Sequence, residues 1–128
     1  MTRYRISTAG LWEARAGYSR AIVVGDSCHV SGTTDAGPDG ESRHPGDAGA
    51  QARVTFGIIE HALNEAGFAL EDVVRTRMYI VDPDDADAVI AVHGELFRDV
   101  RPAATMVVVA RLIRPSLLVE IEADARRA

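Results

Sequence analysis

The 128-residue sequence contains no lysine, and all 14 of its basic residues are arginine. Lysine amines form Schiff bases with carbonyl substrates, so this class of covalent catalysis is excluded. Codon bias of the genome is the simplest cause of the arginine excess. The chemical consequence is the same whatever the cause.

Cysteine and long apolar runs are also scarce. The single cysteine, Cys28, cannot form an internal disulfide. It stands in the apolar run "CHVSG", which favours a small buried thiol over a reactive nucleophile. No apolar run approaches 18 residues, which excludes a membrane span, and the start "MTRYRISTAG" lacks the apolar core of a secretory signal. We therefore expect a cytoplasmic protein.

Positive charge is in deficit, with 14 basic against 19 acidic residues and a net charge of −5. A nucleic-acid surface needs an excess of cations to neutralise phosphates, so nucleic acid is not an expected partner. The sequence is 47% hydrophobic and 26% charged, which is typical of a globular protein. Its length predicts one domain over residues 1–128.

Metal and cofactor motifs are missing as well. The four histidines (29, 44, 61 and 93) show no metal-ligand spacing with each other or with the cysteine. His61 and His93 fall on predicted helices and are most simply surface or half-buried residues. The run "SGTTDAG" is neither a Walker A loop nor a GxGxxG fingerprint. We expect no metal and no cofactor.

Periodicity predicts several strands and two helices. Strands are expected at "RYRIS", 21–25, 28–32, 73–81, 104–112 and 117–125. A hairpin turn at Asp26-Ser27 joins the second and third of these, and the first is an edge strand. The segment "RPAATMVVVARL" (101–112) has the β-branched composition of a buried strand. Between them, residues 33–46 form a long loop rich in glycine and proline, a kind of loop that is often functional or mobile.

The first helix is predicted from an Asp47 cap to Ala66, with Gly67 as the residue that ends it. Its buried face is broad; the expected members are Val54, Phe56, Ile58, Ile59, Ala62, Leu63 and Ala66. The second helix opens at Asp82-Pro83 and has an apolar stripe of Val89, Val92, Leu96 and Phe97.

Two strands alternate clearly between faces. On the 73–81 strand, Val74, Thr76, Met78 and Ile80 share one face, opposite Arg75, Arg77 and Tyr79. On the last strand, Leu117, Val119, Ile121 and Ala123 are core residues, whereas Leu118, Glu120, Glu122 and Asp124 share the opposite face. The arginines are expected to pair with these carboxylates across the sheet. The whole pattern predicts an α+β fold, a mixed β-sheet with two helices packed on one face.

One carboxylate pair and one glycine are candidates for chemistry. Glu120 and Glu122 are two residues apart on a strand, so they project from the same face roughly 6–7 Å apart. Two carboxyl groups can act as acid and base when different environments give them different pKa values. The same spacing also occurs on a solvated strand face whose carboxylates form salt bridges. Backbone N–H groups near Gly32 are suited to an anion or a carbonyl oxygen.

Taken in order, the segments resemble the RidA family (also called YjgF or L-PSP), small enamine/imine deaminases. The segments that carry this resemblance are "GYSRAIVVGD", "VSGTT", "QARVTFGIIEHALNEAGFALEDVVRTRMYIVD", "RPAATMVVVARL" and "VEIEADA". The resemblance implies a chorismate-mutase-like fold and a homotrimer around a central barrel, with small-molecule sites in clefts between subunits. The carboxylate face of the last strand would then lie at an interface, where charged groups must be paired.

The resemblance also implies site residues. Glu120 matches the catalytic glutamate, which handles the attacking water as a general base. Tyr18 lines the pocket, and backbone N–H groups at Gly32 or Met106 polarise the reacting atom. Thr33 and Thr105, beside these positions, complete the expected substrate-binding set.

At one position the sequence departs from the family pattern. Active members carry an arginine after the Pro-Ala of the penultimate strand, where it binds the substrate carboxylate; here Pro102-Ala103 is followed by Ala104. Losing a bidentate charged contact weakens binding of an imino acid by on the order of a hundredfold. Arg20, Arg15 or Arg111 could restore the charge, although each is more simply a surface or interface ion-pair residue.

Three hypotheses follow. The first is an imine or enamine deaminase for a small molecule without an amino-acid carboxylate. The second is a trimer that binds a ligand or a protein in the same cleft without catalysis. The third, least favoured by the acidic charge, is an endoribonuclease. In each, Trp12 and Glu13 either shape the pocket or form a simple lid over the sheet edge.

Overall fold

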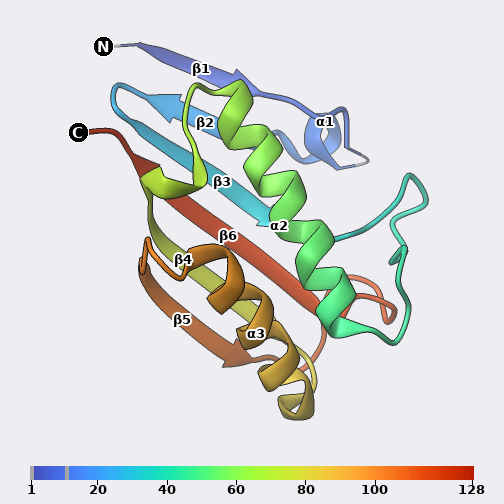
Figure 1. Cartoon of the computed structure of the whole chain (residues 1–128). Helices are drawn as coiled ribbons and strands as arrows, with labels where there is room; N and C mark the ends of the chain where they lie inside the picture. Colours follow the sequence, from blue (N-terminus) through green and yellow to red (C-terminus); the bar gives the residue numbers. More distant parts are fainter. Residues whose placement is uncertain (1, 11) are drawn as a thin grey trace.

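The computed structural model describes residues 2–10 and 12–128, and shows one six-stranded sheet with two long helices on one face (Figure 1). The strands are β1 (Arg3–Ile6), β2 (Ala21–Val24), β3 (Ser27–Thr33), β4 (Val73–Ile80), β5 (Ala103–Val108) and β6 (Val119–Arg126). The helices are α1 (Glu13–Ala16), α2 (Ala48–Glu65) and α3 (Ala86–Phe97), with short 3₁₀ helices at Leu70–Asp72 and Pro83–Asp85.

The sheet is mixed, as predicted, with strand order β1-β2-β3-β6-β4-β5. Every pair is antiparallel except β4 and β5, which α3 joins as a parallel crossover. The last strand in the sequence, β6, therefore lies in the middle, between β3 and β4. That position brings Glu120 next to the end of β3.

The helix caps follow the sequence. The Asp47 side chain accepts a hydrogen bond of 3.0 Å from the backbone N–H of Ala50. Gly67 has φ +85°, the left-handed conformation that ends a helix and that glycine adopts without strain. Both boundaries of α2 are thus confirmed.

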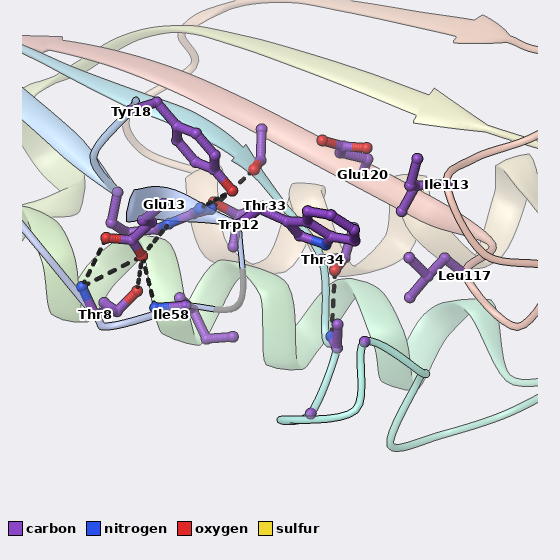
Figure 2. A pocket seen from close by; sticks show the side chains of 16 residues that line it. Thr8, Trp12, Glu13, Tyr18, Thr33, Thr34, Ile58, Ile113, Leu117 and Glu120 are labelled. Atoms are coloured by element: carbon purple, nitrogen blue, oxygen red, sulfur yellow. Dashed lines mark hydrogen bonds and ion pairs between the residues drawn. The ribbon is translucent and has the colours of Figure 1, made fainter. Parts of the chain in front are cut away.

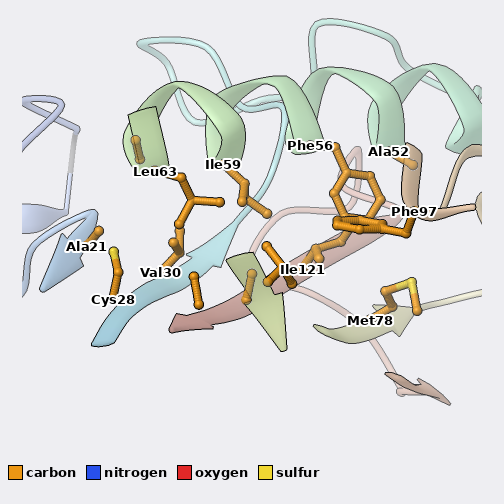
Figure 3. Close-up of a cluster of buried hydrophobic side chains, with 14 of the residues drawn as sticks. Ala21, Cys28, Val30, Ala52, Phe56, Ile59, Leu63, Met78, Phe97 and Ile121 are labelled. Atoms are coloured by element: carbon orange, nitrogen blue, oxygen red, sulfur yellow. The ribbon is translucent and has the colours of Figure 1, made fainter. Parts of the chain in front are cut away.

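The core lies between α2, α3 and the sheet (Figure 3). Phe56, Ile59 and Leu63 of α2 are fully buried against Ile121 of β6. Cys28 is fully buried in the same core, and burial raises the pKa of its thiol to about 11. The prediction of a small buried thiol is confirmed. The buried face is narrower than predicted, because Val54 and Ile58 are only half-buried at its border.

The alternation of β6 is confirmed: Val119, Ile121 and Ala123 are buried, and the carboxylates face the other way. Arg77 lies 3.8 Å from Glu122 and 3.4 Å from Asp124, so the predicted cross-strand ion pairs are present.

Three expectations were wrong in detail. Val74 is half exposed, because the β4–β6 register shifts between Val73 and Arg75 and turns this side chain outward. The β2–β3 turn is Gly25-Asp26, since Ser27 already pairs with Val24. The 104–112 strand ends at Val108 and is not buried in this chain; β5 is an edge strand whose side chains are largely exposed.

The long loop after β3 is held by a buried carboxylate. Asp35 accepts hydrogen bonds from the Ser42 hydroxyl at 2.9 Å and from the backbone N–H groups of Arg43 and His44. Gln51 of α2 donates to the carbonyl oxygens of His44 and Ser116, which ties the loop to the helix. Within the described residues, no helix has the length and apolar character to cross a membrane.

Candidate active site

A cavity of about 190 Å³ lies at the end of β3, enclosed by the sheet, α2 and the segment around α1 (Figure 2). Four other segments meet there: the 34–40 loop, the 113–117 loop, the start of β6 and residues 8–10. The pairing of β3 with β6 is irregular at this point. Their register shifts between Val30 and Thr33, which opens the sheet beside Glu120.

Gly32 is required by the position of Glu120. A Cβ atom at residue 32 would overlap the Oε2 atom of the Glu120 carboxylate. Only glycine therefore allows the carboxylate to lie against the backbone of β3. This explains why the "VSGTT" run has a glycine in the middle of a strand.

Glu120 is a carboxylate in the cavity wall without a hydrogen-bond partner among the described residues. Its side chain is half-buried, and its carboxylate makes no hydrogen bond to any residue in 2–10 or 12–128. Burial raises the pKa of this carboxyl; the nearby Arg20 lowers it, the neighbouring Glu122 raises it, and the pKa stays above its ordinary value. A carboxylate of this kind is a stronger base than an exposed one, and it is free to contact a ligand.

Arg20 is buried, not a surface residue, with 8% of its area exposed. Its Nη1 atom donates to the carbonyl oxygen of Gly32 and to the Thr33 hydroxyl, both at 2.8 Å. Its Nη2 atom donates to the Tyr18 hydroxyl at 3.4 Å, and its Nε atom lies 3.9 Å from a carboxylate oxygen of Glu13. The guanidinium group is thus fixed by protein groups at the cavity wall.

Glu13 is buried as well, with 5% of its area exposed. It accepts hydrogen bonds from the hydroxyls of Ser7 and Thr8, at 3.0 and 2.6 Å, and from the backbone N–H of Gly10 at 3.1 Å. Burial alone would raise its pKa, but these hydrogen bonds outweigh burial and lower the pKa below its ordinary value. Glu13 is therefore an ionised partner of Arg20, and it anchors the segment before α1.

The other walls are largely apolar. The aromatic and aliphatic side chains that line the cavity and are labelled in Figure 2 are Trp12, Tyr18, Ile58, Ile113 and Leu117. Arg15 stacks over the Trp12 ring at 5.1 Å and does not line the cavity. The arrangement suits a small ligand with an apolar body and one polar group directed at Glu120.

The structure brings most of the predicted site together. Tyr18, Arg20, Gly32, Thr33 and Glu120 all line the cavity. The predictions that Trp12 and Glu13 shape the pocket agree with their positions there.

Other predicted residues lie elsewhere. Ala104, Thr105 and Met106 are on β5, which β4 separates from β6, so in one chain they do not reach the cavity. Arg111 is exposed outside the cavity lining. Glu122 accepts a hydrogen bond of 2.6 Å from the Tyr79 hydroxyl and does not share the cavity with Glu120. The second carboxylate of the cavity is Glu13, a residue for which strand spacing gave no signal.

Metal-binding chemistry has no support in the geometry. Across residues 2–10 and 12–128, no three histidine, cysteine, aspartate or glutamate side chains are close enough together to hold an ion. His61 is exposed, and His93 is half-buried with its Nε2 atom 2.8 Å from the Thr76 hydroxyl.

Comparison with known proteins identifies the family. The family model described as "Endoribonuclease L-PSP" matches residues 9–127. The chain belongs to this family. The L-PSP chain is 39% identical to protein SCO2049 of Streptomyces coelicolor, over 96% of this chain and 91% of that one. It is 34% identical to the 3-aminoacrylate deaminase RutC of Acinetobacter baylyi, over 86% of each chain.

Solved structures of the family have the same fold. Rv2704 of Mycobacterium tuberculosis, a member of the YjgF/YER057c/UK114 family, superposes with a TM-score of 0.89 at 43% identity, covering 98% of this chain and 100% of that one. The YjgF gene product of E. coli superposes with a TM-score of 0.82 at 30% identity, over 98% and 99% of the two chains. The resemblance to the RidA/YjgF/L-PSP family and the α+β fold that it implied are confirmed.

Proposed function

We propose that this L-PSP protein is a deaminase that hydrolyses the C=N bond of a small imine, or of the imine tautomer of an enamine. Water adds to the carbon, ammonia leaves, and a carbonyl compound is released. The relative named 3-aminoacrylate deaminase supports this reaction class, because its substrate is an enamine. The observation that carries the proposal is Glu120, a carboxylate of raised pKa that lines a cavity of about 190 Å³ and accepts no hydrogen bond from the described residues.

Glu120 has two roles in this reaction. It accepts a proton from the attacking water, and it then returns that proton to the departing nitrogen. The backbone at Gly32 lies against the carboxylate, so a substrate atom that lies beside the two groups is within reach of both. Tyr18, fixed through Arg20, forms part of the wall.

The substrate we propose has no amino-acid carboxylate. Ala104 offers a methyl group where the active family members carry a carboxylate-binding arginine. We further propose that three copies assemble, and that Ala104, Thr105 and Met106 of one copy complete the cavity of its neighbour. The exposed β5 edge supports this assembly, because an apolar strand edge open to water favours pairing or coverage.

The test uses an imine without a carboxylate. Phenylmethanimine, generated from benzylamine by a flavin amine oxidase, is converted to benzaldehyde and ammonia, and benzaldehyde formation is followed against the protein-free rate. We expect Glu120→Gln to lower the catalysed rate by about 10²–10⁴-fold, because the amide cannot accept the proton. Glu95→Gln, the same change at an exposed residue of α3, leaves the rate as it is.

Each other outcome has a clear meaning. Equal rates for the native protein and Glu120→Gln would remove the proposed role of Glu120. Tight binding of carboxylate-free imines or their analogues without turnover would favour the second hypothesis, a trimer that binds a ligand in this cleft without catalysis. RNA cleavage by the purified protein would favour the endoribonuclease activity for which the family is named.

A further inference from the structure

The cavity wall contains one buried cation, Arg20, with the Glu13 carboxylate 3.9 Å from its Nε atom. Arg20 directs Nη1 to Gly32 and Thr33 and lies with Nε next to Glu13. Both members of this ion pair are at least nine-tenths buried, so water screens their interaction little. An anionic ligand would have to compete with Glu13 for this guanidinium group.

The remaining charge is negative. Among the described residues that line the cavity, the ionised side chains are Glu13, Arg20 and Glu120. Arg20 offsets only one of the two carboxylates, and it also lowers the pKa of Glu120, so the three side chains sum to one negative charge. Because Glu120 also accepts no hydrogen bond from the described residues, a ligand that brings N–H donors or a positive charge satisfies it.

The size of the cavity limits the body of the ligand. Its volume is about 190 Å³, and its apolar walls are Trp12, Tyr18, Ile58, Ile113 and Leu117. An apolar cavity of about 150 Å³ is sufficient to bind benzene. One six-membered ring therefore fits next to Glu120, with a planar nitrogen group directed at the carboxylate.

We propose that Glu13, by keeping Arg20 paired, makes this pocket selective for a cationic or neutral nitrogen group carried on one apolar ring, and selective against carboxylates. Glu13 is a specificity-determining residue that acts through Arg20. The substrates of this class are imines derived from amines rather than from amino acids. This inference rests on the proposed function only in taking the cavity as the substrate site.

The test compares two probes of nearly the same shape and opposite charge. Benzamidinium and benzoate both carry a planar three-atom group on a benzene ring. By calorimetric titration of the native protein, we expect benzamidinium to bind at least tenfold more tightly than benzoate. Tighter binding of benzoate would overturn the proposal without any mutation.

The variant Glu13→Gln keeps an oxygen that accepts from Thr8 and Gly10 but removes the charge that balances Arg20. We expect benzoate affinity to rise, and the benzamidinium-to-benzoate preference to fall, by on the order of tenfold to a hundredfold. The matched control, Glu95→Gln, makes the same change of net charge far from the cavity and leaves both affinities unchanged. An unchanged preference in Glu13→Gln contradicts the role of Glu13.

A second variant tests the same proposal in case Glu13→Gln does not fold. Arg20→Gln removes the cation and leaves two carboxylates, so benzamidinium binds more tightly and benzoate does not gain. Weaker benzamidinium binding in this variant would overturn the proposal. Turnover of phenylmethanimine is measured separately. Charge selectivity without turnover would contradict the deaminase proposal alone. Turnover without charge selectivity would contradict this inference alone.

Discussion

At the scale of single residues, the cavity contains two glutamates with opposite environments. Glu13 receives several hydrogen bonds that outweigh its burial, and its pKa is lowered. Glu120 receives none from the described residues, and burial raises its pKa. When two carboxyl groups in one site have different environments, their pKa values separate. One group then stays ionised while the other can transfer a proton. The sequence offered Glu120 and Glu122 as a candidate for such a pair, with a salt-bridged strand face as the alternative. Glu122 lies with Arg77 and Tyr79, as that alternative predicts, and the second carboxylate of the cavity is Glu13.

The pH dependence of turnover tests the Glu120 environment. Only the ionised carboxylate accepts a proton from water, so kcat/KM falls as the pH falls through the pKa of Glu120. Because burial and Glu122 raise that pKa, the loss occurs at a higher pH than for an exposed glutamate. In Glu122→Gln one of these causes is removed, and we expect the loss to move to lower pH. The measurement is kcat/KM for phenylmethanimine across pH 4–8, with Glu60→Gln as the exposed control; a shift to higher pH would contradict the prediction.

At the scale of elements, local sequence rules account for α2 and β6. The Asp47 cap and Gly67 define α2, since both act through hydrogen bonds and backbone angles of adjacent residues. The alternation of β6 follows from a period of two and directs Glu120 away from the core. The bulge on β4 was not predicted. It depends on how β6 pairs with β4, and it turns Val74 outward.

The cap of α2 gives a stability prediction. Asp47→Ala removes the acceptor for the N–H of Ala50, so we expect the free energy of unfolding to fall by about 1 kcal/mol. Urea unfolding monitored by circular dichroism measures it as a lower midpoint with an unchanged slope. Glu60→Ala, an exposed change in the same helix, is expected to stay within about 0.5 kcal/mol. A loss from Asp47→Ala no larger than from Glu60→Ala would show that the cap contributes nothing.

At the scale of the whole molecule, β5 is an edge strand with exposed apolar side chains. Val107 and Val108 are 41% and 53% exposed, and among the described residues β4 is the strand that pairs with β5. The proposed trimer covers this strand and brings Ala104, Thr105 and Met106 to a second copy's cavity. Paired charges such as Arg77 with Asp124 are compatible with burial at the same interface.

The assembly is tested by mass in solution. Sedimentation equilibrium is expected to give about three times the chain mass of 13.8 kDa. Val107→Asp places a charge on the face that we expect to be covered, so the mass falls toward that of one chain and turnover is lost with it. Ile90→Asp, at an apolar residue of α3 that is 53% exposed, leaves the mass unchanged. A monomeric native protein would contradict the assembly.

By itself, the sequence determined what local patterns control. The caps and turn residues place α2, the two-residue period selects the core face of β6, and the order of weakly specific segments indicated the L-PSP family and hence the fold. These features depend on interactions between residues close together in the chain, so a short stretch of sequence is enough to predict them.

Only the tertiary structure decided the composition of the cavity. Gly32 and Glu120 meet because β6 inserts between β3 and β4, and the bulge between Val30 and Thr33 opens the space beside them. Arg20 has the polar side chain of a surface residue, but it is buried because Glu13 and the end of β3 satisfy it. β5 has the composition of a core strand but lies at the sheet edge, because pairing between distant strands, rather than composition, fixes its place.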